Sequence, residues 1–210
     1  MSKTIKEIMA VSPLMPVMVI NNVEHAVPLA KALVKGGLSV LEITLRTDAA
    51  LEAIRQIKAA VPEAIVGAGT IINEQTLHAA IDAGAEFIVS PGTTPHLADA
   101  ALKTGVPFLP GVSTPGEALA LYEKGISEMK FFPAEAAGGV AMLKSIGAPI
   151  PQITFCPTGG VNQANVADYY RLPNVGVVGG SWMCAASLVD AENWDEITRL
   201  SAEAVQLATA

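Results

Sequence analysis

Short apolar runs alternate with amphipathic helical patterns along the whole of this 210-residue chain. The runs are nearly continuous in apolar residues, which is typical of strands that are buried on both faces of a sheet. In the stretches between them, apolar residues recur at helical spacing, which predicts helices that cover the strands. This alternation predicts an α/β fold built around a parallel sheet.

Eight of the apolar runs are predicted to be strands. They are Leu14 to Ile20, Val40 to Leu45, Ile65 to Ala68, Phe87 to Ser90, Phe108 to Leu109, Met129 to Phe132, Ile153 to Phe155 and Val175 to Val178. The helical stretches include His25 to Val34, Ala49 to Ala60, Gln75 to Ala83 and Leu97 to Lys103. Such strand and helix units close naturally into a (β/α)8 TIM barrel. An open doubly wound sheet is the alternative, because strand order cannot be read from a single sequence.

The predicted helices begin at capping residues. Thr114 precedes Pro115 and is followed by Glu117, which is the pattern of a helix N-terminus with a capping box. Thr4 and Glu7 repeat this box, which predicts an extra N-terminal helix over Thr4 to Ala10, before the first strand. No linker or repeat interrupts the pattern, so residues 1–210 are expected to form a single domain.

The composition excludes several classes of protein. With 51% hydrophobic and 16% charged residues, the chain can bury a large core and is not intrinsically disordered. Its formal net charge of -7 has the wrong sign for binding nucleic-acid phosphates or anionic lipids. The longest uncharged stretch, Leu172 to Val189, is divided by proline and glycine residues. We therefore expect no nucleic-acid partner and no association with a membrane.

Cysteine and histidine usage predicts a metal-free protein of a reducing compartment. Cys156 and Cys184 are too few and too far apart for a disulfide framework or a cysteine-built zinc site, so a cytoplasmic location is expected. His25, His78 and His96 lack the paired spacing that is typical of metal ligands. We expect no cofactor and no metal ion.

Lys130 lies inside an apolar strand pattern, in the run Met129-Lys130-Phe131-Phe132-Pro133. Alternate side chains of a barrel strand point to the interior, so its amine is expected near the barrel axis. Burial disfavours the charged form, and lowering the lysine pKa from about 10.4 to about 7 or 8 would supply a neutral amine that forms a Schiff base with a carbonyl group. A structural salt bridge with Glu128 or Glu42 is the alternative.

The second predicted strand has one polar face. Its two-residue period places Glu42, Thr44 and Arg46 on one side, opposite Leu41, Ile43 and Leu45. Inside a barrel, Glu42 would be a carboxylate able to carry protons, and Arg46, at the strand end, would be an anion receptor. An inert ion pair between Glu42 and Lys130 stays open as the alternative.

Glycine-containing turns are predicted after the last two strands. Pro157-Thr158-Gly159-Gly160 follows the seventh predicted strand, and Gly179-Gly180-Ser181 follows the eighth. Glycine lets backbone N–H groups approach an anion closely, and barrels often build a phosphate site from these two loops. The two turns therefore predict a phosphate site, with ordinary turns as the alternative.

Two further strand ends are expected to contribute to the mouth of the barrel. Thr70 ends the run Gly67-Ala68-Gly69-Thr70, which lacks the dinucleotide-binding fingerprint and so does not indicate a nicotinamide cofactor. Its hydroxyl could contribute to a site, although a turn at a helix start is equally plausible. Pro91, in Ser90-Pro91-Gly92, belongs to a similar strand-end turn.

Six segments stand in order along nearly the whole chain. They are Glu42-Ile-Thr-Leu-Arg46-Thr, Val66-Gly-Ala-Gly-Thr70, Ser90-Pro-Gly, Lys130-Phe-Phe-Pro-Ala-Glu135, Cys156-Pro-Thr-Gly-Gly160 and Gly179-Gly-Ser-Trp182. Together they resemble the 2-keto-3-deoxy-6-phosphogluconate (KDPG) aldolase family, whose members often also cleave 4-hydroxy-2-oxoglutarate (KHG).

The resemblance implies a class I aldolase on a (β/α)8 barrel, a cytoplasmic homotrimer of the Entner-Doudoroff pathway that cleaves KDPG to pyruvate and D-glyceraldehyde 3-phosphate. It implies that Lys130 forms the Schiff base and that Glu42 is the general acid and base. It further implies that a 2-keto acid or phosphosugar acid is held by Arg46, Thr70, Pro91, Phe132, Thr158, Gly159, Gly160, Gly180 and Ser181.

Two other functions stay open from the sequence. One keeps the Schiff base but takes unphosphorylated KHG, or a related 2-keto acid, as the main substrate. The other is non-enzymatic, a barrel that binds a phosphate ligand and in which Lys130 and Glu42 form a buried structural pair.

Overall fold

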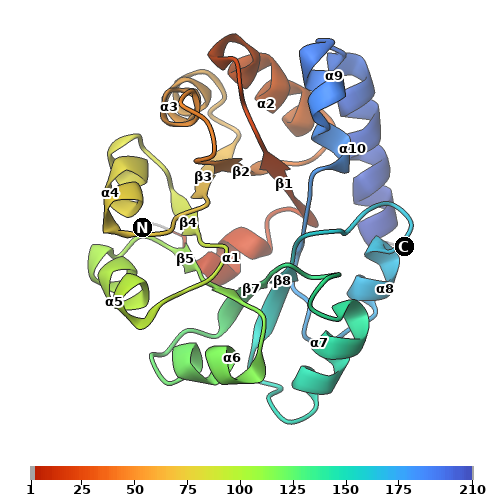
Figure 1. The fold of residues 1–210 in the computed structure, drawn as a ribbon. Helices are drawn as coiled ribbons and strands as arrows, with labels where there is room; N and C mark the ends of the chain where they lie inside the picture. The colour runs from red at the N-terminus through yellow and green to blue at the C-terminus, as the bar shows by residue number, and fades with distance from the viewer. Residues whose placement is uncertain (1–2, 210) are drawn as a thin grey trace.

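The structure, a computed structural model, describes residues 3–209, and in it strands alternate with helices as predicted. The strands are β1 (Leu14–Met18), β2 (Val40–Thr44), β3 (Ile65–Gly69), β4 (Phe87–Val89), β5 (Phe108–Leu109), β6 (Gly111–Val112), β7 (Glu128–Phe131), β8 (Thr154–Pro157) and β9 (Val178–Gly180). The helices are α1 (Ile5–Met9), α2 (Ala26–Lys35), α3 (Ala50–Ala60), α4 (Glu74–Asp82), α5 (Pro95–Thr104), α6 (Pro115–Tyr122), α7 (Gly139–Gly147), α8 (Val166–Tyr170), α9 (Ala186–Asp190) and α10 (Trp194–Thr209), with short 3-10 helices η1 (Val23–His25) and η2 (Trp182–Cys184). Figure 1 shows the strands at the centre and most of the helices around them.

The strand pairings between the described residues are all parallel, as predicted. One sheet has the order β5-β4-β3-β2-β1-β9, and the other has the order β6-β7-β8. Pro110 alone separates β5 from β6 in the chain, and an isolated parallel bridge joins Thr158, just after β8, to Gly179 in β9. The two sheets are therefore neighbours at both of their edges.

The position of the last strand differs from the prediction of Val175 to Val178. β9 begins at Val178 and includes Gly179 and Gly180, which pair with Met15 and Pro16 of β1. Two glycines carry no apolar side chain, so the sequence pattern does not mark them as strand. Upstream, Val175 forms only an isolated bridge with Phe155.

A second difference concerns the predicted strand over Phe108 to Leu109, which resumes after one residue as β6. Pro110 interrupts it because proline has no N–H group to donate to a neighbouring strand. Its carbonyl oxygen still accepts a hydrogen bond of 2.8 Å from the backbone N–H of Lys130. Pro110 and β6 therefore connect this strand to β7, whereas β5 pairs with β4.

Apolar side chains form two clusters, one on each side of the strands. The larger cluster lies between the strands and the outer helices, and it includes Met129 and Phe131 of β7. The smaller cluster lies within the ring of strands and contains Met15, Val40, Phe87, Val89, Leu109, Cys156 and Val177. Because side chains of a strand alternate between its faces, Lys130 points to the inside. The predicted orientation of Lys130 is confirmed.

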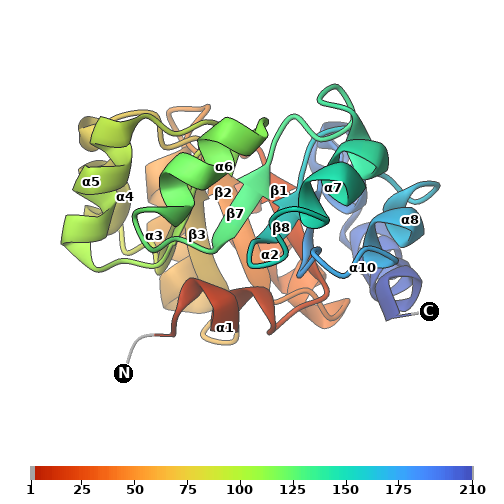
Figure 2. The same ribbon diagram turned by 90° about the horizontal axis from the view of Figure 1, so that it is seen from below.

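Helix α1 covers the end of the ring where the strands begin. The Thr4 N–H donates to Glu7 Oε2 at 2.7 Å, and the Glu7 N–H donates to Thr4 Oγ1 at 3.2 Å, so the predicted capping box is present. Ile8 and Met9 are buried in the inner cluster, against Val40 at the start of β2. Figure 2 shows α1 lying across this end of the strands. The carboxyl ends of the strands are left for a site.

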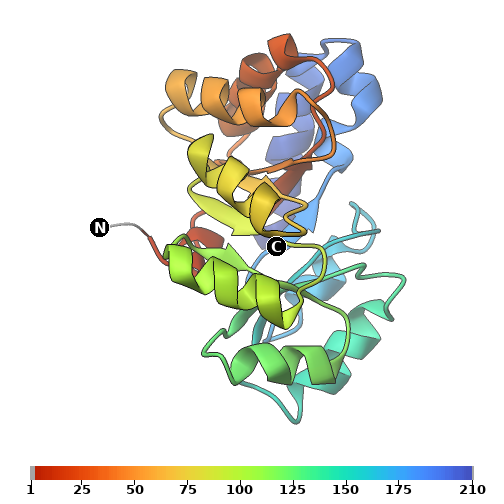
Figure 3. The ribbon, with the colours of Figure 1, turned by 60° about the vertical axis from the view of Figure 1, so that its left-hand side comes forward.

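The outer helices begin where their caps predict. Thr94 and Thr114 accept hydrogen bonds from the backbone N–H groups of Leu97 and Glu117. Hydrogen bonds from the backbone of Ser113, together with those from Thr114, lower the pKa of Glu117. In Figure 3, α3 to α6 follow one another in chain order down the side of the molecule, from orange to green. Over residues 3–209, we find no helix with the length and hydropathy of a membrane span.

Candidate active site

Lys130 and Glu42 meet inside the ring of strands. Lys130 Nζ lies 3.0 Å from Glu42 Oε1 and 3.3 Å from Oε2, and the two residues are only 5% and 2% exposed. Glu42 comes from β2 and Lys130 from β7, so the contact joins the two sheets. Glu128 instead accepts a hydrogen bond from its neighbour Ser127. Of the two predicted partners of Lys130, the structure therefore selects Glu42.

One glycine residue of β3, Gly69, makes the space that Glu42 occupies. The register places Glu42 opposite Gly67 and Thr44 opposite Gly69. A Cβ atom on Gly69 would lie 2.1 Å from Glu42 Oε1, so any side chain there would displace the carboxylate. The sequence pattern did not identify this role, because a glycine within a strand usually indicates only a bulge or a close backbone contact.

The remaining neighbours of Lys130 are an aromatic ring and a thiol. Lys130 Nζ lies 5.4 Å from the ring centroid of Phe132, at cation–π distance. Cys156 stands opposite Lys130 in the register of β7 and β8. Burial raises the pKa of the Cys156 thiol to about 12, so the thiol stays neutral at pH 7. Cys156 therefore does not replace Glu42 as the charged partner of the amine.

The polar face predicted for β2 leads from the buried pair to the mouth of the ring. Thr44 is buried, and its Oγ1 donates to the carbonyl oxygen of Met18 at 2.8 Å. Arg46 Nε donates to Thr44 Oγ1 at 3.2 Å, and Arg46 itself is exposed. None of the ion pairs found within residues 3–209 involves Arg46. The hydrogen bond to Thr44 orients the guanidinium group through its Nε atom. The other N–H groups of Arg46 can then bind an anion.

A cavity of about 190 Å³ brings together most of the predicted site residues. They come from the residues that follow β2, β7 and β8, from the end of β9 and from Ser181 just after it, so the cavity opens at the carboxyl ends of the strands. Its lining consists of Val17, Arg46, Phe132, Thr158, Gly159, Gly160, Val161, Gly179, Gly180 and Ser181.

The segment after β8, here called the glycine loop (residues 158–160), forms one wall of the cavity. Gly159 and Gly160 have φ angles of 100° and 82°, in the left-handed region that favours glycine. The carbonyl oxygens of Thr158 and Gly159 accept hydrogen bonds from the backbone N–H groups of Ala134 and Glu135, at 2.8 and 3.0 Å. Among the hydrogen bonds found within residues 3–209, none is donated by the N–H group of Gly159 or Gly160. The loop can offer these N–H groups to an anion.

The second predicted turn proves to be strand. Gly179 and Gly180 belong to β9, and Ser181 follows it as an exposed residue of the cavity wall. A Cβ atom on Gly179 would lie 2.2 Å from Thr158 Oγ1, and one on Gly180 would lie 2.1 Å from the Trp182 ring. Gly179 is therefore needed for close packing against Thr158 of the glycine loop, and Gly180 for close packing against Trp182.

Thr70 and Pro91 do not line this cavity. Thr70 directly follows Gly69 at the end of β3, and its φ of 64° lies in the left-handed region, which is uncommon for a β-branched residue. Pro91 lies beside Gly111, where a Cβ atom would approach the Pro91 carbonyl carbon to 2.4 Å. Both residues therefore lie at strand ends but outside the group that lines the cavity. Strained backbone of this kind is often found at functional sites, so Thr70 stays a candidate site residue.

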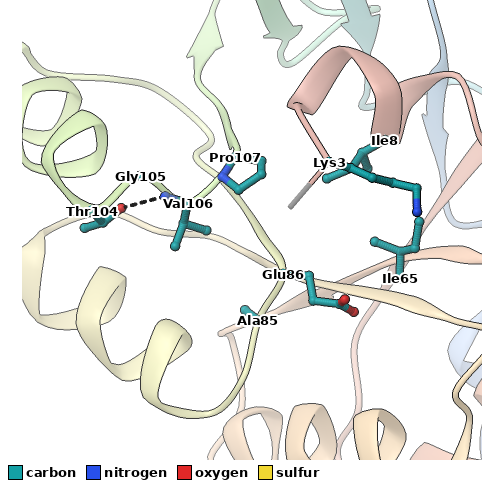
Figure 4. A pocket seen from close by; sticks show the side chains of 9 residues that line it. All are labelled: Lys3, Ile8, Ile65, Ala85, Glu86, Thr104, Gly105, Val106 and Pro107. Carbon is teal, nitrogen blue, oxygen red and sulfur yellow. Dashed lines mark hydrogen bonds between the residues drawn. The ribbon is translucent and has the colours of Figure 1, made fainter. Parts of the chain in front are cut away.

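A larger cavity, of about 450 Å³, lies beside α1 at the opposite end of the ring (Figure 4). Its two charged lining residues are Lys3 and Glu86, and Glu86 is engaged by Lys58 and by the Val66 N–H group. The lining consists of Lys3, Ile8, Ile65, Ala85, Glu86, Thr104, Gly105, Val106 and Pro107. Because it holds none of the predicted site residues, we place the candidate active site at the smaller cavity and the buried pair.

A family model and known proteins match this chain over nearly its whole length. A family model described as KDPG and KHG aldolase matches residues 5–200. The KHG/KDPG aldolase of Escherichia coli (strain K12) is 50% identical over 201 residues, which cover 96% of this chain and 94% of that relative.

Two solved structures are similar in fold as well as in sequence. KDPG aldolase from Legionella pneumophila, with pyruvate captured at low pH as a covalent carbinolamine intermediate, matches with a TM-score of 0.94 and 44% identity, over 97% of this chain and 98% of that one. The KDPG aldolase of Zymomonas mobilis ZM4 with 3-phosphoglycerate matches with a TM-score of 0.91 and 44% identity, over 96% of this chain and 94% of that one.

We expect Lys130→Met to lower the free energy of unfolding more than the double variant Lys130→Met with Glu42→Gln does. The single variant leaves the Glu42 carboxylate buried without its partner, which typically costs about 3–5 kcal/mol, whereas the double variant removes both charges. Urea unfolding of the wild type, both single variants and the double variant measures the coupling. If the two single effects simply add, the side chains do not interact in the folded protein.

Proposed function

The chain belongs to the KDPG and KHG aldolase family, and from this membership we propose that its reaction proceeds through a Schiff base on Lys130. The protein is a class I aldolase that cleaves KDPG to pyruvate and D-glyceraldehyde 3-phosphate and also acts on KHG. The observation that carries the proposal is the buried contact of 3.0 Å between the amine of Lys130 and the carboxylate of Glu42. An amine and a proton acceptor in contact, beside a cavity with an anion receptor, are the groups that imine chemistry requires.

The first half of the reaction forms the imine. Glu42 takes a proton from Lys130 Nζ across their hydrogen bond, and the free amine adds to the C2 carbonyl carbon of the substrate. Glu42 returns the proton to the C2 oxygen and then transfers a second proton to it from the nitrogen, so that the oxygen leaves as water. The product is a protonated imine between Lys130 and C2, which withdraws electrons from the neighbouring carbon atoms.

The second half breaks the carbon–carbon bond. Glu42, directly or through a water molecule, removes the proton of the C4 hydroxyl group. The C3–C4 bond breaks, its electron pair moves into the imine to give an enamine, and the aldehyde leaves. The enamine is then protonated at C3, and hydrolysis of the imine releases pyruvate and restores Lys130.

The two ends of the substrate are assigned to different walls. We propose that Arg46 and Thr70 bind the carboxylate end, with Phe132 and Pro91 beside the reacting carbon atoms. The distal phosphate is assigned to the glycine loop with Gly180 and Ser181. The cavity supports this division, because Arg46 stands at one edge and the glycine loop forms another wall. Binding energy from the phosphate would then orient C4 for cleavage.

We propose that the fold is a closed (β/α)8 barrel of a single domain. Counting β5 and β6 as one strand interrupted at Pro110 gives eight strands. The bridge between Thr158 and Gly179 supports closure between β8 and β9. Helix α1 is then additional to the eight units and covers the bottom of the barrel, as the burial of Ile8 and Met9 supports.

We further propose that the protein is a cytoplasmic homotrimer of the Entner-Doudoroff pathway, as the family resemblance implies. Exposed apolar side chains that could contribute to a contact between copies include Ile72, Leu102, Leu119 and Tyr122. Two buried cysteines without a disulfide bond are compatible with a reducing compartment.

Treatment with pyruvate and borohydride is expected to attach a reduced adduct to Lys130, because borohydride traps the imine. Peptide mass mapping locates the adduct. Lys130→Ala should give no label, whereas Lys31→Ala, a change of an exposed lysine on α2, should be labelled like the wild type. A label on another lysine, or its absence from the wild type, would contradict the assignment.

Glu42→Gln is expected to lower kcat for KDPG cleavage by about 10²- to 10⁴-fold, because an amide cannot accept and return the protons. The matched control is Glu128→Gln, which changes a carboxylate two residues from Lys130 whose side chain accepts a hydrogen bond from Ser127. It should retain the wild-type rate, and circular dichroism should show both variants folded. A Glu42→Gln enzyme with wild-type kcat removes this carboxylate from the mechanism.

Sedimentation equilibrium is expected to give a molecular mass about three times that of the 21.7 kDa chain. The exposed apolar residues supply surface that association would remove from water. A mass equal to that of one chain, at the concentration of the activity assay, would refute the trimer.

A further inference from the structure

Glu135 and Tyr169 form a hydrogen bond behind the glycine loop. The Tyr169 hydroxyl group on α8 donates to Glu135 Oε1, in the turn that follows β7. Glu135 ends the segment that begins at Lys130 and resembles the aldolase family, but neither residue lines the cavity. The mechanism above uses neither of them, so their contact requires a separate explanation.

Glu135 contacts the glycine loop through both its backbone and its side chain. Its backbone N–H donates to the Gly159 carbonyl oxygen at 3.0 Å. A Cβ atom on Gly160 would lie 2.6 Å from Glu135 Cγ and 2.7 Å from its Cβ. The methylene groups of Glu135 therefore lie directly on the backbone of Gly160. A shift of the Glu135 side chain would change the position of this glycine.

Tyr169 holds the outer end of the Glu135 side chain. Glu135 is exposed, whereas Tyr169 is fully buried, so the ring is the fixed partner. Burial and the neighbouring Glu135 raise the pKa of the Tyr169 hydroxyl, which therefore stays protonated and donates. A Cβ atom on Gly139 would lie 3.0 Å from Glu135 Oε1 and 3.3 Å from the Tyr169 hydroxyl oxygen. The first residue of α7 thus leaves room for this hydrogen bond.

The opposite side of the glycine loop is held by two asparagine side chains. Asn162 Nδ2 and Asn165 Nδ2 donate to the Gly160 carbonyl oxygen at 3.1 and 3.2 Å. With the contacts from Ala134 and Glu135, the carbonyl oxygens of all three loop residues are engaged. A peptide group is planar, so a hydrogen bond to its carbonyl oxygen also fixes the direction of its N–H group. The bonds to the carbonyl oxygens of Thr158 and Gly159 therefore fix the N–H groups of Gly159 and Gly160.

We propose that Glu135 and Tyr169 are a positioning pair that holds the glycine loop in the conformation that binds the phosphorylated end of the substrate. The proposal rests on the function proposed above and extends it to residues that touch no substrate. The pair acts through Gly159 and Gly160 alone. It therefore affects phosphorylated KDPG, and it leaves unphosphorylated KHG and the imine on Lys130 unaffected.

Tyr169→Phe tests the pair, because it keeps the buried ring and removes only the hydroxyl group. Glu135 is exposed, so water can solvate the carboxylate that loses its donor. We expect KM for KDPG to rise about 3- to 10-fold, the range for loss of part of one hydrogen bond, with kcat nearly unchanged. KM for KHG and borohydride labelling with pyruvate should equal those of the wild type.

Two further variants and a control separate positioning from folding. Glu135→Gln retains an oxygen that accepts from Tyr169 and keeps the methylene groups on Gly160, so its KM for KDPG should stay near the wild-type value. Glu135→Ala removes both the oxygen that accepts from Tyr169 and the methylene groups on Gly160. It should raise the KM for KDPG at least as much as Tyr169→Phe does. Tyr122→Phe, the same change at an exposed tyrosine of α6, should leave KM for both substrates unaltered.

The outcomes distinguish the pair from the proposed function. An equal rise of KM for KDPG and KHG in Tyr169→Phe, or no rise for either, overturns the positioning role while labelling of Lys130 in the wild type still supports the Schiff base. A wild-type enzyme that cleaves no KDPG and takes no label overturns the proposed function, and the positioning role with it.

Discussion

The contact between Lys130 and Glu42 is the constraint that the rest of the interior accommodates. Removing two charges from water is expensive, and well-packed apolar side chains of similar volume are often at least as stable. Several features are arranged around the pair at a cost in packing, among them the absence of a side chain at Gly69 and the buried hydroxyl group of Thr44. This cost in packing is explained if Lys130 and Glu42 take part in a reaction. The stability of the buried pair then depends on the hydrogen bonds between the amine and the carboxylate.

The two ends of the strands differ in character. At one end, Ile8 and Met9 of α1 belong to an apolar cluster with inward-facing residues of the strands. At the other end, Arg46 and the glycine loop line a small cavity that also has apolar residues in its wall. The buried pair lies between these two environments. Both residues of the pair are almost completely buried, at 5% and 2% exposure.

Residues in a periodic pattern or in a strand-end glycine motif could be predicted from the sequence, and residues joined only by the fold could not. Lys130 stands out in an apolar strand, and the two-residue period of β2 placed Glu42 and Arg46 on the inner face. The limits of β9 were missed because glycine has no side chain that marks a strand. The contact between Glu135 and Tyr169 was missed for another reason: it joins residues 34 positions apart, through a fold that local patterns do not specify.

The glycine loop has a consequence for the response to acidity. A receptor built from lysine or histidine gains and loses charge with pH, whereas peptide N–H groups have no proton to exchange in the range where enzymes work. The wall at Gly159 and Gly160 therefore keeps the same electrostatic character from weakly acidic to alkaline solution. A phosphate monoester has its second ionisation near pH 6. If this wall holds the phosphate as proposed, a change in its affinity for the phosphorylated end near pH 6 follows from ionisation of the phosphate, because the N–H groups of Gly159 and Gly160 keep their protons.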